Sequence, residues 1–188
     1  PPARGPYTSP HAFVEEACRR ACRGTSISFN EPTLSLEWSL KVFRLARRRG
    51  LYNTIVTNGY MTEEALERIQ PYLDAANVDL KSFQEKFYKE VCGARLKPVL
   101  ETLGLMRQMG IWVEITTLVI PTMNDDDQQL GGIANWIHNE LGELTPWHVT
   151  RFYPPHQLRH VPPTPPPTLQ RAPALEERDT RALAYPEL

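Results

Sequence analysis

Two cysteines near the beginning of the chain have a spacing used by metal-binding thiols. Cys18 and Cys22 form a C-x3-C pair within CRRACRGT, residues 18–25. A third cysteine at position 25 would complete C-x3-C-x2-C, a pattern whose thiolates hold a [4Fe–4S] cluster with one iron open, but that position is Thr25. Two thiols alone cannot bind a cubane cluster. The pair therefore belongs either to a site that has lost a ligand or to a structural element.

Polar side chains also stand at or near the ends of apolar, strand-like runs. The carboxyl ends of parallel strands are where α/β proteins place their chemistry. A single such residue is weak evidence, because Asn30 is equally suited to cap the helix expected after Pro32. Polar residues that recur at the ends of successive strands favour a binding site for a polar ligand at the mouth of a barrel. The residues concerned are Asn30, Glu31, Thr57, Asn58, Asp79, Lys81, Glu114, Thr116, His148 and Arg151.

The sequence VDLKS, residues 78–82, is the most specific of these patterns. Asp79 and Lys81 are two positions apart in an expected strand, so both side chains point to the same face. Burying an ammonium and a carboxylate is costly unless each has a partner. The pair is either a structural ion pair or a site for a zwitterion, with Lys81 taking a carboxylate and Asp79 or Glu31 an ammonium.

The segments that position these residues alternate between strand and helix patterns. Their alternation predicts an α/β fold with parallel strands and right-handed crossovers. An open doubly wound sheet and a partial (β/α) barrel both suit this rhythm, although no G-x-G-x-x-G follows the first strand. Strands are expected at 25–29, 53–57, 75–83, 111–120 and 146–153, and helices at 10–24, 36–50, from 62 onward, 84–92, 97–109 and 124–141.

The composition changes after residue 151, where proline becomes frequent, as in VPPTPPPT at 161–168. Such a segment is expected to be an irregular tail that propagates neither helix nor sheet. Two regions are therefore predicted, a partial barrel over residues 1–151 and a proline-rich loop and tail over 152–188.

Composition excludes several classes of protein. The 188 residues carry a net charge of −1, which gives no electrostatic case for a nucleic-acid or membrane partner. No apolar run approaches the roughly 20 residues that span a bilayer, and no signal-peptide pattern is present. Three cysteines argue against a secreted disulfide framework. A cytoplasmic globular protein is expected.

An ordered series of motifs resembles a known family. These motifs are SFNEPT (28–33), VTNGY (56–60), VDLKSFQEKFYKEVCGA (78–94), WVEITTLVIPTMND (112–125), PWHVTRFYP (146–154) and VPPTP (161–165). Together they resemble radical S-adenosylmethionine (SAM) enzymes of the pyruvate formate-lyase-activating-enzyme type, and within that group the AmmeMemoRadiSam branch. The resemblance extends from residue 1 to about Ala172. It implies a partial radical SAM barrel, with SAM across the strand ends and its methionine on the open iron of a [4Fe–4S] cluster.

The resemblance also implies a chemistry and a set of cofactor-binding residues. Reductive cleavage of SAM would give a 5′-deoxyadenosyl radical that abstracts hydrogen, from a small molecule or from a protein substrate or partner. Glu31 matches the acceptor for the SAM amino group, Asn58 the residue near the sugar, and Asp79 and Lys81 the D-x-K motif on the methionine portion. The implied set is Asn30, Glu31, Thr57, Asn58, Asp79, Lys81, Thr116, Arg151 and Tyr153, with no catalytic residue and no metal ligand assigned.

Departures from the family pattern bear on the cluster and on the turns. The family's cluster loop is expected upstream of residue 1, so the chain resembles a fragment that is inactive without that loop. Cys18 and Cys22 then have a structural role in the helix before SISF. Tyr153 stands where the family often has His, Thr122 stands where it prefers Gly, and the sequence after Ala172 differs from the family's last helix and strand.

Two alternative functions come from other classes. An aldolase-type barrel could use Lys81 as a Schiff-base lysine, because burial at a strand end suits a nucleophilic amine. The chain could also be a non-catalytic fragment or interaction module that binds SAM weakly at best.

Overall fold

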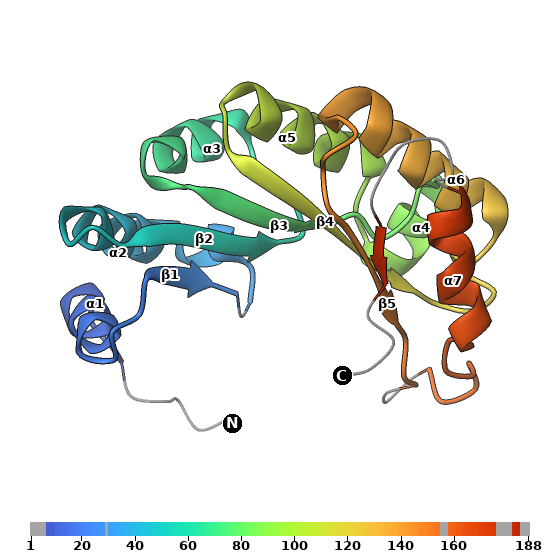
Figure 1. The fold of residues 1–188 in the computed structure, drawn as a ribbon, viewed down its shortest axis with the longest axis horizontal. Coiled ribbons are helices and arrows are strands. Elements are labelled where there is room, and N and C mark those ends of the chain that lie inside the picture. Colours follow the sequence, from blue (N-terminus) through green and yellow to red (C-terminus); the bar gives the residue numbers. More distant parts are fainter. Residues whose placement is uncertain (1–6, 29, 155–157, 176–181, 185–188) are drawn as a thin grey trace.

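The described part of the chain forms one parallel, curved sheet with helices on its convex side (Figure 1). The computed structural model describes residues 7–28, 30–154, 158–175 and 182–184. Within these residues the sheet has six strands in the order β1-β2-β3-β4-β5-β6, all parallel. The strands are β1 (Gly24–Ile27), β2 (Tyr52–Thr57), β3 (Ala75–Asp79), β4 (Trp112–Val119), β5 (Trp147–Arg151) and β6 (Ala182–Ala184).

Helices connect successive strands. Serine, threonine or aspartate begins several of them: Ser9 accepts from the Ala12 amide at 3.2 Å and Thr62 from the Ala65 amide at 3.2 Å. The α-helices are α1 (Pro10–Arg19), α2 (Leu36–Arg48), α3 (Glu63–Ile69), α4 (Glu85–Phe87), α5 (Leu96–Gln108), α6 (Asp127–Trp136) and α7 (Pro166–Leu175). Short 3-10 helices form η1 (Pro32–Ser35) and η2 (Gln70–Tyr72), and short π-helices form η3 (Tyr88–Cys92) and η4 (Ile137–Leu141).

Strand order decides between the two architectures that the sequence left open. A doubly wound sheet reverses its strand order at a switch point, whereas a barrel adds each strand beside the previous one. The strands here follow chain order, so the predicted partial (β/α) barrel is confirmed. β1 pairs only with β2 among the described strands and forms one edge of the sheet.

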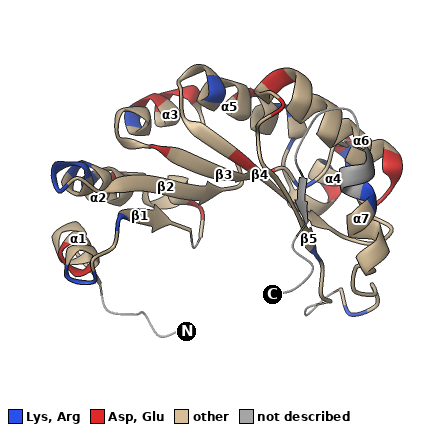
Figure 2. Cartoon of the chain, in the orientation of Figure 1, with Lys and Arg blue, Asp and Glu red and all other residues tan. Residues whose placement is uncertain are grey.

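The two faces of the sheet differ in what covers them. In β4 the side chains of Val113, Ile115, Thr117 and Val119 are buried toward the helices, and the intervening positions are half-buried or exposed on the concave face. Figure 2 shows that charged residues lie mainly on the helices and that the strands carry few. Charged residues are therefore the exception on the described strands, where they are Asp79, Glu114 and Arg151. No helix in the described ranges is both long and apolar enough to cross a bilayer.

Two expectations about local structure are wrong. The proline-rich segment forms the helix α7, and residues beyond it form β6, which pairs with β5. Prolines at the start of α7 fit its first turn, where a helix needs no amide donors. Cys22 lies beyond α1 because Ala21 adopts a left-handed conformation, with φ 53°, that ends the helix.

Candidate functional site

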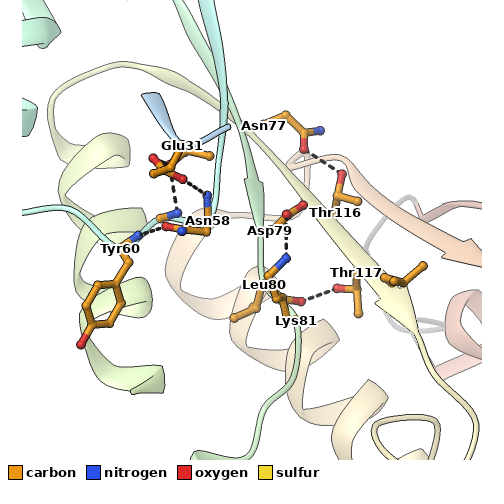
Figure 3. Close-up of polar contacts among 12 residues, drawn as sticks. Glu31, Asn58, Tyr60, Asn77, Asp79, Leu80, Lys81, Thr116 and Thr117 are labelled. Carbon is orange, nitrogen blue, oxygen red and sulfur yellow. Dashed lines mark hydrogen bonds and ion pairs between the residues drawn. The ribbon is translucent and has the colours of Figure 1, made fainter. Parts of the chain in front are cut away.

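Glu31 ties the segment after β1 to the end of β2 (Figure 3). Its carboxylate accepts hydrogen bonds from the Thr57 hydroxyl at 2.7 Å and from the Asn58 amide at 2.9 Å. Weaker contacts come from the amide and hydroxyl of Thr33, at 3.5 and 3.3 Å. No ion pair among the described residues includes Glu31, so a half-buried carboxylate is held by neutral donors only.

The turn after β2 is shaped by Asn58 and Gly59. The Asn58 side-chain oxygen accepts from the Tyr60 amide at 2.8 Å, which closes the turn. Gly59 has a φ of 71°, and a Cβ at this position would lie 2.8 Å from a methyl group of Val78. Both the backbone angle and the close approach to β3 therefore require glycine. The turn presents Asn58 and Tyr60 at the carboxyl edge of the sheet.

Asp79 and Lys81 form an ion pair at the end of β3 (Figure 3). The Lys81 Nζ lies 2.8 Å from the Asp79 Oδ2, and the two side chains are 39% and 34% exposed. The Lys81 backbone is fixed on both sides: its amide donates to the Tyr88 hydroxyl at 3.1 Å, and its carbonyl accepts from the Asn124 amide group at 2.6 Å. The two charges lie together as expected, but the predicted strand 75–83 is too long: β3 ends at Asp79, and Lys81 lies in the segment after it.

The neighbouring strand β4 adds Thr116. Its register pairs Thr116 with Asp79, and the Thr116 hydroxyl donates to the Asn77 side chain at 2.8 Å. Thr117 faces the helices instead, where its hydroxyl donates to the Leu80 carbonyl at 2.8 Å and accepts from the Trp147 indole at 2.9 Å. These bonds hold β3, β4 and β5 together directly behind the site.

A second polar pair lies deeper on the concave face. The His148 Nε2 is 2.9 Å from the Glu114 Oε2, and the exposed Trp112 indole donates to the other Glu114 oxygen at 3.3 Å. This pair joins β4 to β5 across the uncovered face of the sheet.

Three predicted site residues lie apart from these groups. The Arg151 Nε donates to the Thr164 carbonyl at 3.0 Å, and its guanidinium lies 5.0 Å from the centre of the Tyr153 ring. Arg151 follows Val149 by two positions and so belongs to the helix-covered face of β5. Asn30 is exposed, with a φ of 58°. No hydrogen bond or ion pair in the described ranges joins these residues to Asp79 or Lys81, and Phe29 lies outside those ranges.

Sequence reasoning missed the residues that fix the site from behind. Tyr88 and Asn124 both hold the backbone of Lys81, yet Tyr88 lies in one expected helix and Asn124 at the start of another. Nothing in the spacing pointed to a long-range partner for either residue.

Comparisons with known proteins now give the family. A sequence model of the Radical SAM superfamily matches residues 4–130. An uncharacterized protein of Methanocaldococcus jannaschii is 42% identical over 174 residues, which is 92% of this chain and 51% of that protein. The isethionate sulfite-lyase activating enzyme of Nitratidesulfovibrio vulgaris is 30% identical over 153 residues, covering 73% of this chain and 50% of the enzyme. The chain thus spans about half the length of these curated relatives.

Solved structures show the same fold. A domain of pyruvate-formate lyase-activating enzyme from Bacteroides vulgatus superposes with a TM-score of 0.72 at 14% identity, covering 86% of this chain and 98% of that domain. Streptococcus suis SuiB bound to S-adenosylmethionine gives a TM-score of 0.74 at 12% identity, over 97% of this chain and 45% of that chain. With the family model matching well over half of its residues, the chain belongs to the radical SAM superfamily.

Proposed function

We propose that the protein to which this chain belongs is a radical SAM enzyme of the glycyl-radical-activase-like type, and specifically of the AmmeMemoRadiSam branch. One observation carries the proposal: the Asp79–Lys81 pair and the Glu31 carboxylate lie at neighbouring strand ends of a radical SAM barrel. Relatives named as activating enzymes for isethionate sulfite-lyase and pyruvate formate-lyase support the same class of chemistry.

The residues at these strand ends fit the methionine part of SAM. The SAM carboxylate is complementary to Lys81, and the SAM ammonium is complementary to Asp79. On binding, each side chain would replace its present ion-pair partner with the opposite charge of the ligand, so the net charge of the site would not change. Glu31 offers a further acceptor, because its carboxylate has no cationic partner in the described ranges. Bonds to Tyr88 and Asn124 hold Lys81 in place before the ligand arrives, which lowers the cost of ordering it on binding.

The described residues do not fit the iron–sulfur cluster. Cys18, Cys22 and Cys92 are free thiols, and the described ranges contain no group of three metal-binding side chains. In this proposal the cluster ligands therefore come from elsewhere in the full-length protein. A cluster held there would supply the electron for reductive cleavage of SAM. The chain's own residues bind and orient the methionine.

The concave face offers a place for the substrate. Glu114 and His148 form a polar pair on it, and Trp112 is exposed beside them. A protein or peptide substrate is part of the proposal, since a structural neighbour is Streptococcus suis SuiB bound to its precursor peptide. The Schiff-base alternative gains no support from the structure, because the 2.8 Å contact with Asp79 suits a lysine that acts as a cation.

The decisive experiment is reductive cleavage of SAM by the full-length protein. Anaerobic reconstitution with iron and sulfide, followed by dithionite and SAM, should give 5′-deoxyadenosine, and protein without iron should give none. If iron-loaded protein forms no 5′-deoxyadenosine and retains no SAM, the proposal is wrong. Borohydride trapping of a carbonyl compound on Lys81 would then favour the aldolase-type barrel.

A further inference from the structure

A cavity of about 500 Å³ lies beside the proposed SAM site, among the segments that follow β2, β3 and β4. Its inner wall is apolar, with the buried side chains of Phe87, Val99 and Ile120. Tyr60 and Leu118 stand at its rim and are 44% and 40% exposed. A volume of this size is within the roughly 300–1,000 Å³ typical of small-molecule sites.

Tyr88 is a lining residue of the cavity that carries a polar group. The tyrosine is only 3% exposed, and its oxygen accepts from the Lys81 amide at 3.1 Å. No hydrogen bond in the described part of the chain uses the hydroxyl hydrogen of Tyr88. Burial raises the pKa of this phenol, so the hydrogen is retained at neutral pH. A buried donor without an acceptor is costly, and a ligand with an acceptor oxygen would relieve that cost.

The charges around the cavity select against an ionic ligand. Among the described residues that line the cavity, Lys81 alone is charged, and its ammonium is already balanced by Asp79. Cys92 also lines the cavity, and burial raises the pKa of its thiol, which favours the neutral form. A charged ligand would lose its hydration in this mainly apolar cavity, where the Lys81–Asp79 pair leaves no net charge to compensate that loss.

We propose that this cavity binds an uncharged, mainly apolar group that presents one carbonyl or amide oxygen to the Tyr88 hydroxyl. The inference rests on the proposed function and deepens it: next to Lys81 and Asn58, such a group would be the anchoring part of the substrate. An apolar wall would give most of the affinity, and the hydrogen bond would fix the orientation.

Alkylation of Cys92 reports whether the cavity is filled. The full-length protein is treated with iodoacetamide, and modification of Cys92 and Cys22 is followed by peptide mass spectrometry. Acetophenone carries a carbonyl, ethylbenzene has nearly the same shape without one, and benzoate carries a charge. Acetophenone should slow Cys92 alkylation at concentrations about fivefold lower than ethylbenzene, as expected for one neutral hydrogen bond. Benzoate should give no protection, and the exposed Cys22 should react at one rate throughout.

Two variants at the cavity and one control test whether the preference for acetophenone depends on the Tyr88 hydroxyl. Tyr88→Phe should remove the fivefold preference for acetophenone and leave protection by ethylbenzene intact. Tyr60→Phe removes a hydroxyl from the rim of the same cavity and should keep the preference. If loss of the acceptor for the Lys81 amide unfolds Tyr88→Phe, Ala94→Leu provides the test, because it fills the cavity and should abolish protection by both compounds. Equal potency of acetophenone and ethylbenzene in the unsubstituted protein would overturn the inference.

Addition of SAM separates this inference from the proposed function. Acetophenone should still protect Cys92 when SAM is bound, because the two would occupy adjoining sites. Competition between them would make the cavity part of the SAM site and contradict the inference. Protection by acetophenone in a protein that binds no SAM would refute the proposed function and still support the ligand class of the cavity.

Discussion

The Lys81 ammonium and the Asp79 carboxylate are joined at 2.8 Å, and Tyr88 and Asn124 hold the lysine backbone in place. An ion pair of this kind on an open surface would contribute little to stability. In the proposed site, its value lies in keeping two opposite charges in a fixed arrangement at the mouth of the barrel, where a zwitterion would bind.

Removal of the Lys81 charge should weaken SAM binding. Lys81→Ala in the full-length, cluster-loaded protein should lower the affinity for SAM about 10- to 100-fold, the loss expected for one charge-assisted hydrogen bond. Lys81→Arg should restore little, because a planar fork does not replace a compact ammonium. Isothermal titration with SAM measures both, and Lys97→Ala on the exposed face of α5 is the matched control. Unchanged affinity in Lys81→Ala would contradict the zwitterion site.

Glu31 has two roles that substitutions can separate. Glu31→Ala leaves the Thr57 hydroxyl and the Asn58 amide without their acceptor and should cost about 1–3 kcal/mol in free energy of unfolding. Glu31→Gln keeps an acceptor oxygen and should retain more of that stability, yet it loses the negative charge and should still weaken SAM binding. Urea unfolding and SAM titration, with Glu37→Gln as an exposed control, test the two effects. Equal SAM affinity in Glu31→Gln would show that Glu31 is structural only.

Much of the fold could be predicted from the sequence, because alternating strand and helix patterns are local signals. The proximity of Asp79 and Lys81 was expected from their spacing in a strand, although β3 ends at Asp79 and the loop after it brings Lys81 back to the carboxylate. Contacts between distant segments could not be predicted: the hydrogen bond from the Asn58 amide to Glu31 depends on strand register, and the one from the Lys81 amide to Tyr88 depends on how η3 folds back. The high proline content led to the wrong prediction that the segment of α7 is irregular. Prolines are compatible with the first turn of a helix, so the position of a proline matters more than the number of prolines.

Thr122 occupies a turn in a conformation that favours glycine. Its φ is 67°, a region where a β-branched residue is strained. Thr122→Gly should therefore stabilise the protein, by about 1 kcal/mol after the entropic cost of glycine is subtracted. Thr33→Gly, in the turn η1, should destabilise it, since Thr33 is not at positive φ. Thermal unfolding of the two variants tests this, and a lower melting temperature for Thr122→Gly would contradict the strain argument.

Asp126 should make the stability of α6 depend on pH. A hydrogen bond from the Gln129 side chain lowers the pKa of this carboxyl, and the Gln129 amide also donates to it at 2.9 Å. Because the folded pKa is depressed, the stabilisation is present above the unfolded pKa of about 3.9 and is lost as pH falls through the folded value. Asp126→Asn keeps the cap but cannot titrate. The difference in free energy of unfolding between this variant and the unsubstituted protein should therefore shrink below about pH 4.

Urea unfolding between pH 7 and pH 3 measures this difference. Asp126→Ala removes the cap and should cost about 1 kcal/mol at pH 7. Asp127→Asn is the control, because Asp127 contacts Arg171 at the surface and does not cap α6. If the free energies of unfolding of Asp126→Asn and the unsubstituted protein differ by a constant amount down to pH 3, the Asp126 carboxylate does not cause the pH dependence.

Cys18 and Cys22 should be dispensable for iron. Cys18 lies in α1 and packs against the core, whereas Cys22 is exposed beyond the end of that helix. No group of three metal-binding side chains exists within the described ranges, so neither thiol has the partners that a cluster requires. Cys18→Ala and Cys22→Ala in the reconstituted full-length protein should therefore keep the full iron content per chain. Iron analysis and the visible absorption of the cluster measure this, and loss of iron in either variant would return the C-x3-C pair to the cluster.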